Sequence, residues 1–314
     1  MSIPRPHLPS YLSLFEAGEL ARRARAASRR LEACDLCPRT CGKNRRAGER
    51  GACRSAERAV VASYGPHHGE EECLSGSCGS GTIFFSGCNL GCVFCQNWEI
   101  SHVGGGTEVG PAELAAMMLE LQAQGCHNVN FVSPSHVIPQ LLAAVEVAAG
   151  RGLRLPLVYN TGGYDSLESL ALLDGVVDLY MPDMKYGDSA LGRKYSKVAN
   201  YVEVNRGAVK EMHRQVGDLV VDDHGLARRG LLVRHLVMPD GISGSEEVFT
   251  FLAEGVSRDT YVNVMDQYRP CHRAGEYPAL ARRVSHEEVR QALRSAERHG
   301  LRLDRRRPAS LRLF

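Results

Sequence analysis

Three closely spaced cysteines are the residues of this chain best suited to chemistry. Cys88, Cys92 and Cys95 form a C-x3-C-x2-C triplet that directly follows a short apolar, strand-like segment. Three thiolates at this spacing can hold three corners of a cubane iron–sulfur cluster, and the fourth iron then lacks a protein ligand. A set of four cysteines would saturate the cluster and suit electron transfer or a structural role. The triplet therefore predicts a [4Fe-4S] cluster with one iron open to a substrate or cofactor.

The alternative is a structural zinc site or three unrelated buried cysteines. Structural zinc sites usually pair two short cysteine knuckles, and this triplet has no nearby fourth ligand that would close such a site. Gly87 and Gly91 permit the tight backbone that three ligands in so short a loop require. The cluster is therefore the favoured interpretation.

A second set of cysteines lies near the amino terminus and comprises Cys34, Cys37, Cys41 and Cys53. Four thiolates so close in sequence can fully ligate one Zn2+ or one cubane cluster, and the spacing does not decide between the two metals. Such a saturated site would serve structure or electron relay. The chain has 11 cysteines, and their clustering favours metal ligation in a reducing compartment over disulfides, so we expect a cytoplasmic protein.

The segment from residue 81 onward alternates short apolar strands with helical patterns. The expected strands are Thr82–Phe85, Val129–Val132, Leu155–Tyr159, Val177–Met181, Leu231–Val237 and Tyr261–Met265. The expected helices are Pro111–Gln124, Val137–Ala149, Ser166–Leu173, Ala199–Val216, Glu246–Glu254 and His286–His299. Six β–α units imply a parallel sheet with right-handed crossovers, and they are too few for an eight-stranded barrel. The predicted fold class is therefore α/β, as an open, partial (β/α)6 barrel of the TIM type with a small amino-terminal metal module.

The sequence divides into three predicted regions. Residues 1–60 carry an Arg-rich amphipathic helix over Leu12–Ala33 and the four-cysteine module. Residues 61–300 form the barrel, which includes a hairpin at Asp218–Gly225, and residues 301–314 form a basic tail.

Composition excludes several classes of function. The chain has 314 residues, a hydrophobic content of 44% and a net charge of +2, which match an ordinary globular protein. Near-neutral charge gives no general case for attraction to nucleic acid or to membranes. No run of about 18 apolar residues predicts a transmembrane helix, and the first residues lack the features of a secretory signal.

The triplet, with the aromatic Phe94 just before its last cysteine, closely resembles the signature of the radical S-adenosylmethionine (SAM) superfamily. The resemblance implies that the open iron chelates SAM, that Phe94 lies at the cofactor, and that an electron from the cluster cleaves SAM to a 5′-deoxyadenosyl radical. Reduced flavodoxin or ferredoxin is then the expected electron donor. Further stretches are similar to the pyruvate formate-lyase-activating-enzyme-like branch, namely residues 68–71, 79–85, 95–97, 234–237 and 267–270.

Polar residues at the ends of the strands are candidates for SAM binding, because catalytic groups gather at the carboxyl ends of barrel strands. Ser133 follows the second strand, where many radical SAM proteins carry a Gly-Gly-Glu stretch that this chain lacks, and a helix N-cap is its alternative. Asn160 follows the third strand beside two glycines, with a plain turn as the alternative. His272 lies in the loop after the sixth strand, where a surface histidine is equally expected.

Three charged residues complete the candidate site. Asp183 and Lys185 follow the fourth strand and project to the same side of an extended chain. A carboxylate suits the sulfonium cation, and the ammonium suits the SAM carboxylate or ribose; an exposed ion pair is the alternative. Arg234 lies within the apolar fifth strand, where a buried cation needs a partner, either a ligand carboxylate or a structural salt bridge. The ligand carboxylate is the favoured interpretation because Arg binds it bidentately.

The resemblance suggests an enzyme that installs a glycyl radical on a partner protein or modifies a peptide. Radical modification of RNA or of a small metabolite is the alternative. The arginines of the amino-terminal region are better explained as a solvated face than as an RNA site, so nucleic acid is not an expected partner. An electron carrier with two clusters is a third class, but it does not account for an open iron on a barrel. The sequence leaves the substrate open, and also whether SAM is consumed or regenerated.

Overall fold

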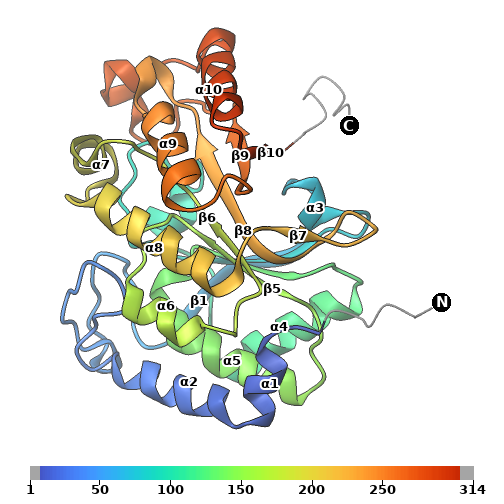
Figure 1. The fold of residues 1–314 in the computed structure, drawn as a ribbon. Coiled ribbons are helices and arrows are strands. Elements are labelled where there is room, and N and C mark those ends of the chain that lie inside the picture. The colour runs from blue at the N-terminus through green and yellow to red at the C-terminus, as the bar shows by residue number, and fades with distance from the viewer. Residues whose placement is uncertain (1–7, 305–314) are drawn as a thin grey trace.

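Six parallel strands form the centre of the fold in the order predicted from the sequence. The structure, a computed structural model, describes residues 8–304. The six strands are β2 (Ser80–Phe85), β4 (Val129–Val132), β5 (Leu157–Thr161), β6 (Leu179–Pro182), β8 (Ala227–Leu236) and β9 (Tyr261–Met265). They pair in parallel as β2-β4-β5-β6-β8-β9, and within the described residues the sheet does not close on itself. The α/β fold with an open, partial barrel is confirmed (Figure 1).

Strands that were not predicted extend both edges of this sheet. β1 (Ala59–His67) pairs antiparallel with β2 and with β3 (Thr107–Val109), and β10 (Arg302–Leu303) adds to β9 in parallel. Gly65 and Pro66 weaken the strand propensity of β1. Pro66 lacks an N–H group but is tolerated here. β3 pairs with β1 only at residues 59–61, so no strand pairs with β1 at Pro66 on the side of β3. β10 lies in the segment predicted as a basic tail, most of which falls outside the described residues.

The predicted hairpin at Asp218–Gly225 is present. β7 (Val220–Val221) pairs antiparallel with the start of β8, and the Asp222 carboxylate accepts hydrogen bonds from the main chain of His224 and Leu226 across the turn. Gly225 has a φ of 78°, which a Gly-containing turn readily adopts.

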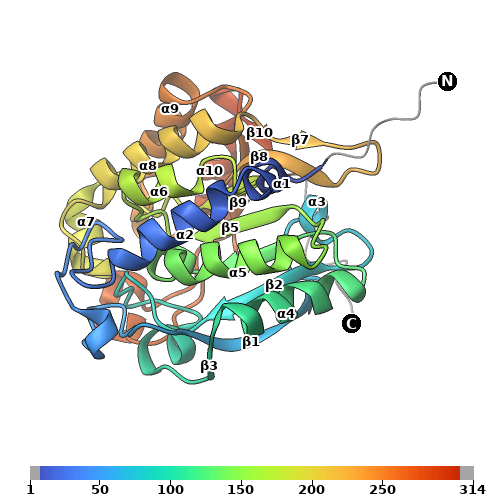
Figure 2. The ribbon, with the colours of Figure 1, turned by 90° about the horizontal axis from the view of Figure 1, so that it is seen from below.

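Helices cover the outer face of the sheet, as Figure 2 shows from below. They are α4 (Pro111–Ala123), α5 (Ile138–Gly150), α6 (Leu167–Leu173), α7 (Ser189–Ser196), α8 (Tyr201–Val216), α9 (Ser245–Gly255) and α10 (His286–Arg298). α3 (Glu72–Ser75) is a single turn between β1 and β2. None of the helices within residues 8–304 is long and apolar enough to cross a membrane.

Two of the predicted helices differ in extent from the structure. The helix expected over Leu12–Ala33 is divided into α1 (Tyr11–Glu16) and α2 (Glu19–Arg29), because Gly18 adopts a left-handed conformation with a φ of 70°. The helix expected over Ala199–Val216 begins at Tyr201, after the shorter α7. Lys197, with a φ of 60°, ends α7 and turns the chain toward α8.

The strand register separates an outer face from an inner face. Phe131, Tyr159 and Tyr180 are register partners across β4, β5 and β6, and they belong to the large core between the sheet and the helices. Residues one position away, such as Val158 and Leu179, form a separate apolar cluster inside the barrel. Alternation along each strand therefore gives the helices a continuous apolar surface and leaves the inner face for the site.

The four-cysteine loop is held by its own main chain and lies at the same end of the barrel as α7. The N–H of Cys34 donates to the carbonyl of Lys43 (3.0 Å), and the N–H of Gly42 donates back to the carbonyl of Cys34 (3.0 Å). The loop follows α2, whose Leu20, Ala24 and Ala27 are part of the main core. In Figures 1 and 2 this blue loop and α7 lie on the same side of the picture, at the carboxyl ends of the strands.

Candidate active site

The cysteine triplet lies in the loop that leaves the carboxyl end of β2. Main-chain hydrogen bonds join this loop to the end of α7: the N–H of Gly91 donates to Ser196 (2.9 Å) and the N–H of Val93 donates to Tyr195 (2.8 Å). Gly87, with a φ of 85°, passes so close to the carbonyl of Cys53 that a Cβ at Gly87 would collide with it. The loop is therefore held between α7 and the four-cysteine module.

The three thiols lie together and are largely shielded from solvent. Burial raises the pKa of Cys88 to about 12 and that of Cys92 to about 11, and each thiol lies within electrostatic range of the others. The Cys92 sulfur also contacts the Ser196 hydroxyl at 3.0 Å. Because thiols with raised pKa values are protonated near neutral pH, metal binding here must release protons.

The donor set of this loop suits an iron–sulfur cluster. The three thiols are close enough to influence one another, and the loop contains no fourth cysteine. Three thiolates can hold three corners of a cubane and leave one iron without a protein ligand. The residues present thus fit a [4Fe-4S] cluster.

Asp183 and Lys185 lie beside the triplet. Their side chains form an ion pair, and with exposures of 22% and 14% it is not the solvent-exposed pair that was the alternative. Burial alone would lower the pKa of Lys185, but the charges of Asp183 and Cys92 outweigh burial and raise it. A permanent ammonium group therefore stands next to the cysteines, where an anionic ligand group would be stabilised.

Phe94 is packed inside the loop. It is 4% exposed, and its ring meets Tyr186 (6.5 Å between centroids) and Tyr268 (6.1 Å) at steep angles. Tyr186 in turn contacts the hydroxyl of Ser196 at 2.7 Å. In this structure Phe94 packs the cysteine loop against the segment after β6 and the loop after β9, and Tyr186 extends this contact to α7.

Arg234 has partners that differ from the one favoured from the sequence. Its Nε donates to Glu71 (2.9 Å), its Nη2 donates to Glu71 (2.6 Å), and it also pairs with Glu70. The favoured partner was a ligand carboxylate, whereas the structure fits the alternative of a structural salt bridge. The reason is tertiary: the segment between β1 and β2 brings two buried carboxylates to β8, and Asn263 also donates to Glu71.

Ser133 and Asn160 adjoin each other at the ends of β4 and β5. The N–H of Ser133 donates to the carbonyl of Asn160 (2.8 Å), and Ser133 is strained, with a φ of 57°. Its side chain makes no capping hydrogen bond. Asn160 shares the inner face with its register partners Val132 and Met181. Deeper on this face, the amide of Asn130 is buried with no hydrogen-bond partner among the described residues.

His272 lies in a stack of rings over the cysteine loop. Its exposed ring is parallel to those of His102 (4.9 Å) and Trp98 (5.4 Å). Trp98 and His102 belong to the segment just after Cys95, which forms a short π-helical turn over Glu99–Val103. Sequence reasoning missed both residues, and the signal was the pair of aromatic rings in the run Trp98-Glu-Ile-Ser-His102, which begins three positions after the third cysteine. π-helical turns occur often at functional sites.

The amino-terminal cysteines also come together. Cys34, Cys37, Cys41 and Cys53 line one small cavity, together with Arg39, Arg45 and His136. Burial raises the pKa of Cys37 to about 12, and the other three thiols add to that shift. Arg39 connects this loop to the triplet, because it donates to the carbonyls of Asn89 (2.5 Å) and Lys197 (3.1 Å).

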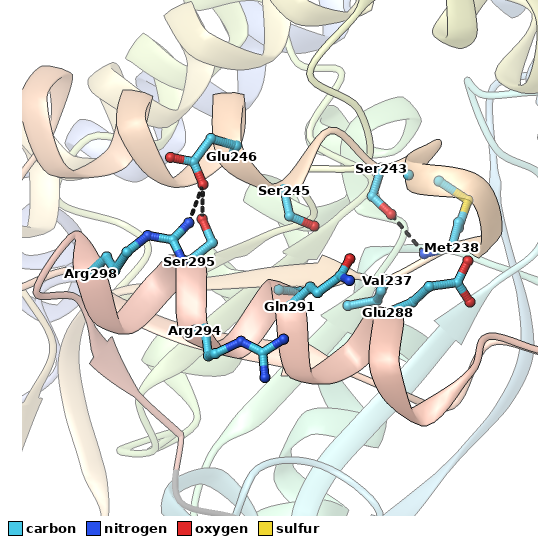
Figure 3. Close-up of a pocket in the computed structure, with 12 residues that line it drawn as sticks. Val237, Met238, Ser243, Ser245, Glu246, Glu288, Gln291, Arg294, Ser295 and Arg298 are labelled. Carbon is cyan, nitrogen blue, oxygen red and sulfur yellow. Dashed lines mark hydrogen bonds and ion pairs between the residues drawn. The ribbon is translucent and has the colours of Figure 1, made fainter.

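A larger cleft lies elsewhere, between α9 and α10 (Figure 3). Glu246 on its wall accepts hydrogen bonds from Ser295 and from Arg298 (2.9 Å), and Ser243 accepts one from the main chain of Met238 (2.7 Å). These groups pair with one another, and no residue predicted for the site lines the cleft. We therefore assign the site to the cysteine end of the barrel.

Comparisons with known proteins indicate the family of the chain. The model of the radical SAM superfamily matches residues 82–222. The uncharacterized protein MJ0674 of Methanocaldococcus jannaschii is 36% identical over 276 residues, which cover 85% of this chain and 75% of that protein.

Solved structures are similar at lower identity. Methylornithine synthase (PylB) matches with a TM-score of 0.48 at 14% identity, over 96% of this chain and 76% of its own. A radical SAM methyltransferase from Sphaerobacter thermophilus matches with 0.45 at 14%, over 71% and 65%. The enzyme anSMEcpe with bound AdoMet and the Cp18Cys peptide matches with 0.48 at 12%, over 68% and 56%. This chain thus spans less than two thirds of the length of the last two.

The buried ion pairs of Arg234 predict a pH-dependent stability. Burial alone would raise the pKa of Glu70, but Arg234 and a hydrogen bond with His67 lower it to about 2. A lowered pKa stabilises the fold above the unfolded value of about 4.5, and this contribution is lost as the pH falls toward 2. Glu70→Gln should therefore lower the free energy of unfolding by about 1.5–3 kcal/mol at pH 7, and by progressively less below pH 4.5.

Urea unfolding of both proteins over a series of pH values measures this difference. Glu72→Gln, at the exposed neighbouring position, is the matched control and should change the free energy of unfolding by less than about 0.5 kcal/mol. A deficit in Glu70→Gln that stays constant from pH 7 to pH 3 would contradict the assignment.

Proposed function

The chain belongs to the radical SAM superfamily, and we propose that it is an enzyme that binds a [4Fe-4S] cluster on Cys88, Cys92 and Cys95 with SAM on the open iron. The observation that carries this proposal is the position of the Lys185–Asp183 pair beside three thiols with no fourth cysteine in their loop. When bound, the cluster supplies the electron that cleaves SAM to a 5′-deoxyadenosyl radical.

The residues of the chain bind and orient SAM and exclude water. We assign Lys185 to the carboxylate or ribose of SAM, because it is a buried cation beside the triplet. Asp183 holds Lys185 in place and favours the sulfonium charge. Asn160, Ser133 and His272 surround the same end of the barrel and are proposed as further SAM contacts, and Phe94 keeps the loop rigid.

We assign the substrate to a protein or peptide. The support is the open barrel, whose ends at β10 and β3 stay apart within the described residues and leave room for a polypeptide beside the cluster. Installation of a glycyl radical on a partner protein is the specific reaction proposed; RNA and small metabolites are the competing substrates. Reduced ferredoxin or flavodoxin is the proposed electron donor. A reducing compartment such as the cytoplasm is the proposed location, because none of the eleven cysteines, all within the described residues, forms a disulfide.

A second metal is proposed on Cys34, Cys37, Cys41 and Cys53. All four line one cavity, and the loop that carries them has little apolar core of its own, since only Leu31, Cys34 and Leu36 form a buried cluster there. Ligation of a zinc ion or an iron–sulfur cluster would stabilise such a loop.

The first test of the proposed function is the chemistry of the reduced protein. After anaerobic reconstitution with iron and sulfide, the wild type should form 5′-deoxyadenosine and methionine from SAM, and SAM should shift the EPR signal of the reduced cluster. The triple variant Cys88→Ala/Cys92→Ala/Cys95→Ala should lose both the product and the shifted signal. A shift that persists in the triple variant would place SAM elsewhere.

The second test concerns the role of Lys185. Lys185→Met keeps the length of the side chain and removes its charge, so SAM affinity should fall by about 1.5–3 kcal/mol, the range for a hydrogen bond to a charged group. Equilibrium binding of SAM to the reconstituted protein measures this change. Lys210→Met, at an exposed position of α8, is the matched control. Equal iron content with unchanged SAM affinity in Lys185→Met would remove Lys185 from the site.

The third test concerns the substrate. Reduced enzyme and SAM are incubated with separate deuterated protein, RNA and small-molecule fractions of a cell extract. If the substrate is a polypeptide, deuterium should appear in 5′-deoxyadenosine only with the protein fraction. Transfer from RNA or from small molecules alone would overturn the polypeptide proposal and leave SAM cleavage itself intact.

A further inference from the structure

A buried arginine in the four-cysteine module has a positive charge that its hydrogen bonds do not neutralise. Arg45 is 1% exposed. Its Nε donates to the carbonyl of Ala56 (3.0 Å) and its Nη1 to the carbonyl of His136 (2.7 Å), while Nη2 has no hydrogen-bond partner. A cation in such surroundings is costly unless an anion lies close by.

A metal centre bound by the four cysteine thiolates would supply this anion. Arg45 lines the same cavity as the four thiols, and its Nη1 lies 3.9 Å from the Cys34 sulfur. A zinc ion or a cubane cluster bound by four thiolates would each carry a net negative charge that Arg45 offsets, and of the two only the cubane can exchange an electron.

We propose that Cys34, Cys37, Cys41 and Cys53 hold a second [4Fe-4S] cluster, that Arg45 is its buried counter-charge, and that this module is the port through which electrons enter the protein. The cluster is fully ligated, so it carries electrons and does not bind SAM. The delivery of these electrons to the triplet rests on the proposed function, whereas the second cluster itself does not.

The two cysteine sets are in direct contact through the main chain. The carbonyl of Cys53 lies against Gly87, the residue just before Cys88. Arg39, between Cys37 and Cys41, donates to the carbonyl of Asn89, the residue just after Cys88. A ligand of each set thus makes such a contact itself or lies within two residues of one, and an electron can pass between the sets over a short path through packed protein.

The outer surface of the module fits an acidic electron carrier. Cys41 is exposed, whereas Cys34, Cys37 and Cys53 are buried, so one ligand faces the solvent. Residues 39–54 contain six basic side chains and one acidic side chain, and Arg50 and Arg54 are exposed beside the cavity loop. Such a surface attracts an acidic one-electron carrier such as reduced ferredoxin or flavodoxin.

The proposed transfer involves one electron and no change in bonding. The reduced carrier gives one electron to the module and is itself oxidised by one electron. The module passes that electron to the metal centre of the triplet and returns to its oxidised state. No proton or covalent bond is exchanged at the module.

The first experiment counts metal in the variant that lacks the triplet. Reconstituted Cys88→Ala/Cys92→Ala/Cys95→Ala should retain about four irons and four sulfides per chain, the content of one cubane. Its reduced EPR signal should not respond to SAM. Zinc bound without sulfide, or no metal at all, would overturn the second cluster.

The second experiment tests the counter-charge in the same background. Arg45→Gln keeps hydrogen-bonding capacity and removes the charge, so the cluster should become harder to reduce by at least tenfold, which is about 59 mV for one electron. Arg45→Lys keeps the charge and should stay close to the parent potential. Equal potentials for all three proteins at equal iron content would remove Arg45 from this role.

The third experiment measures electron entry with the triplet intact. Arg50→Glu/Arg54→Glu should slow the reduction of the protein by reduced ferredoxin at least tenfold. The rate of this reduction should also depend less on the salt concentration. Reduction by the small cation methyl viologen should not slow. Arg25→Glu, an exposed position on α2, is the matched control. Equal rates with ferredoxin for the double variant and the control would overturn the port.

These results separate the two proposals. If the protein binds both clusters and accepts electrons quickly but never cleaves SAM, the proposed function is refuted. The inference that the module is an electron-transfer cluster would still stand. A protein that cleaves SAM but binds no second cluster would do the reverse.

Discussion

The site depends on a loop that must hold three sulfurs at the mouth of the barrel with little apolar core of its own. The loop after β2 is held by contacts with other elements. Gly91 and Val93 donate hydrogen bonds to the main chain of α7, and Gly87 lies against Cys53 of the amino-terminal module. Phe94 adds apolar contacts with two tyrosines from other elements. Since each contact comes from a different part of the chain, the loop is shaped only when the whole fold is complete.

Buried charge is divided between two places in the barrel. Arg234 is neutralised by Glu70 and Glu71 from the segment that leads into α3, which lies at the opposite end of the barrel from α7 (Figure 1). Asp183 and Lys185 lie beside the cysteines instead. The first set satisfies itself and contributes to stability. The second set keeps a cation next to the triplet, where a ligand with a carboxylate can use it.

The amino-terminal module completes the site as well as adding cysteines to it. Its backbone forms one wall of the triplet loop, and Arg39 joins it to both Asn89 and Lys197. Its helix α2 shares the main core with α5, so the module cannot move freely relative to the barrel. A metal centre in this loop would therefore be fixed relative to the triplet, which is the condition that electron transfer over a defined path requires.

The sequence by itself determined the chemistry and the fold class. The spacing of Cys88, Cys92 and Cys95 predicted a cluster, and strand and helix periods predicted the six β–α units that the structure shows, because both signals are local and depend on few residues. Tertiary structure alone decided which charges meet. Arg234 pairs with Glu71, which lies 163 positions away in the sequence. Arg45 lines the four-cysteine cavity, and Trp98 and His102 stack with His272. Neither spacing nor periodicity encodes such pairs, since each depends on how two loops from distant strands pack against one another.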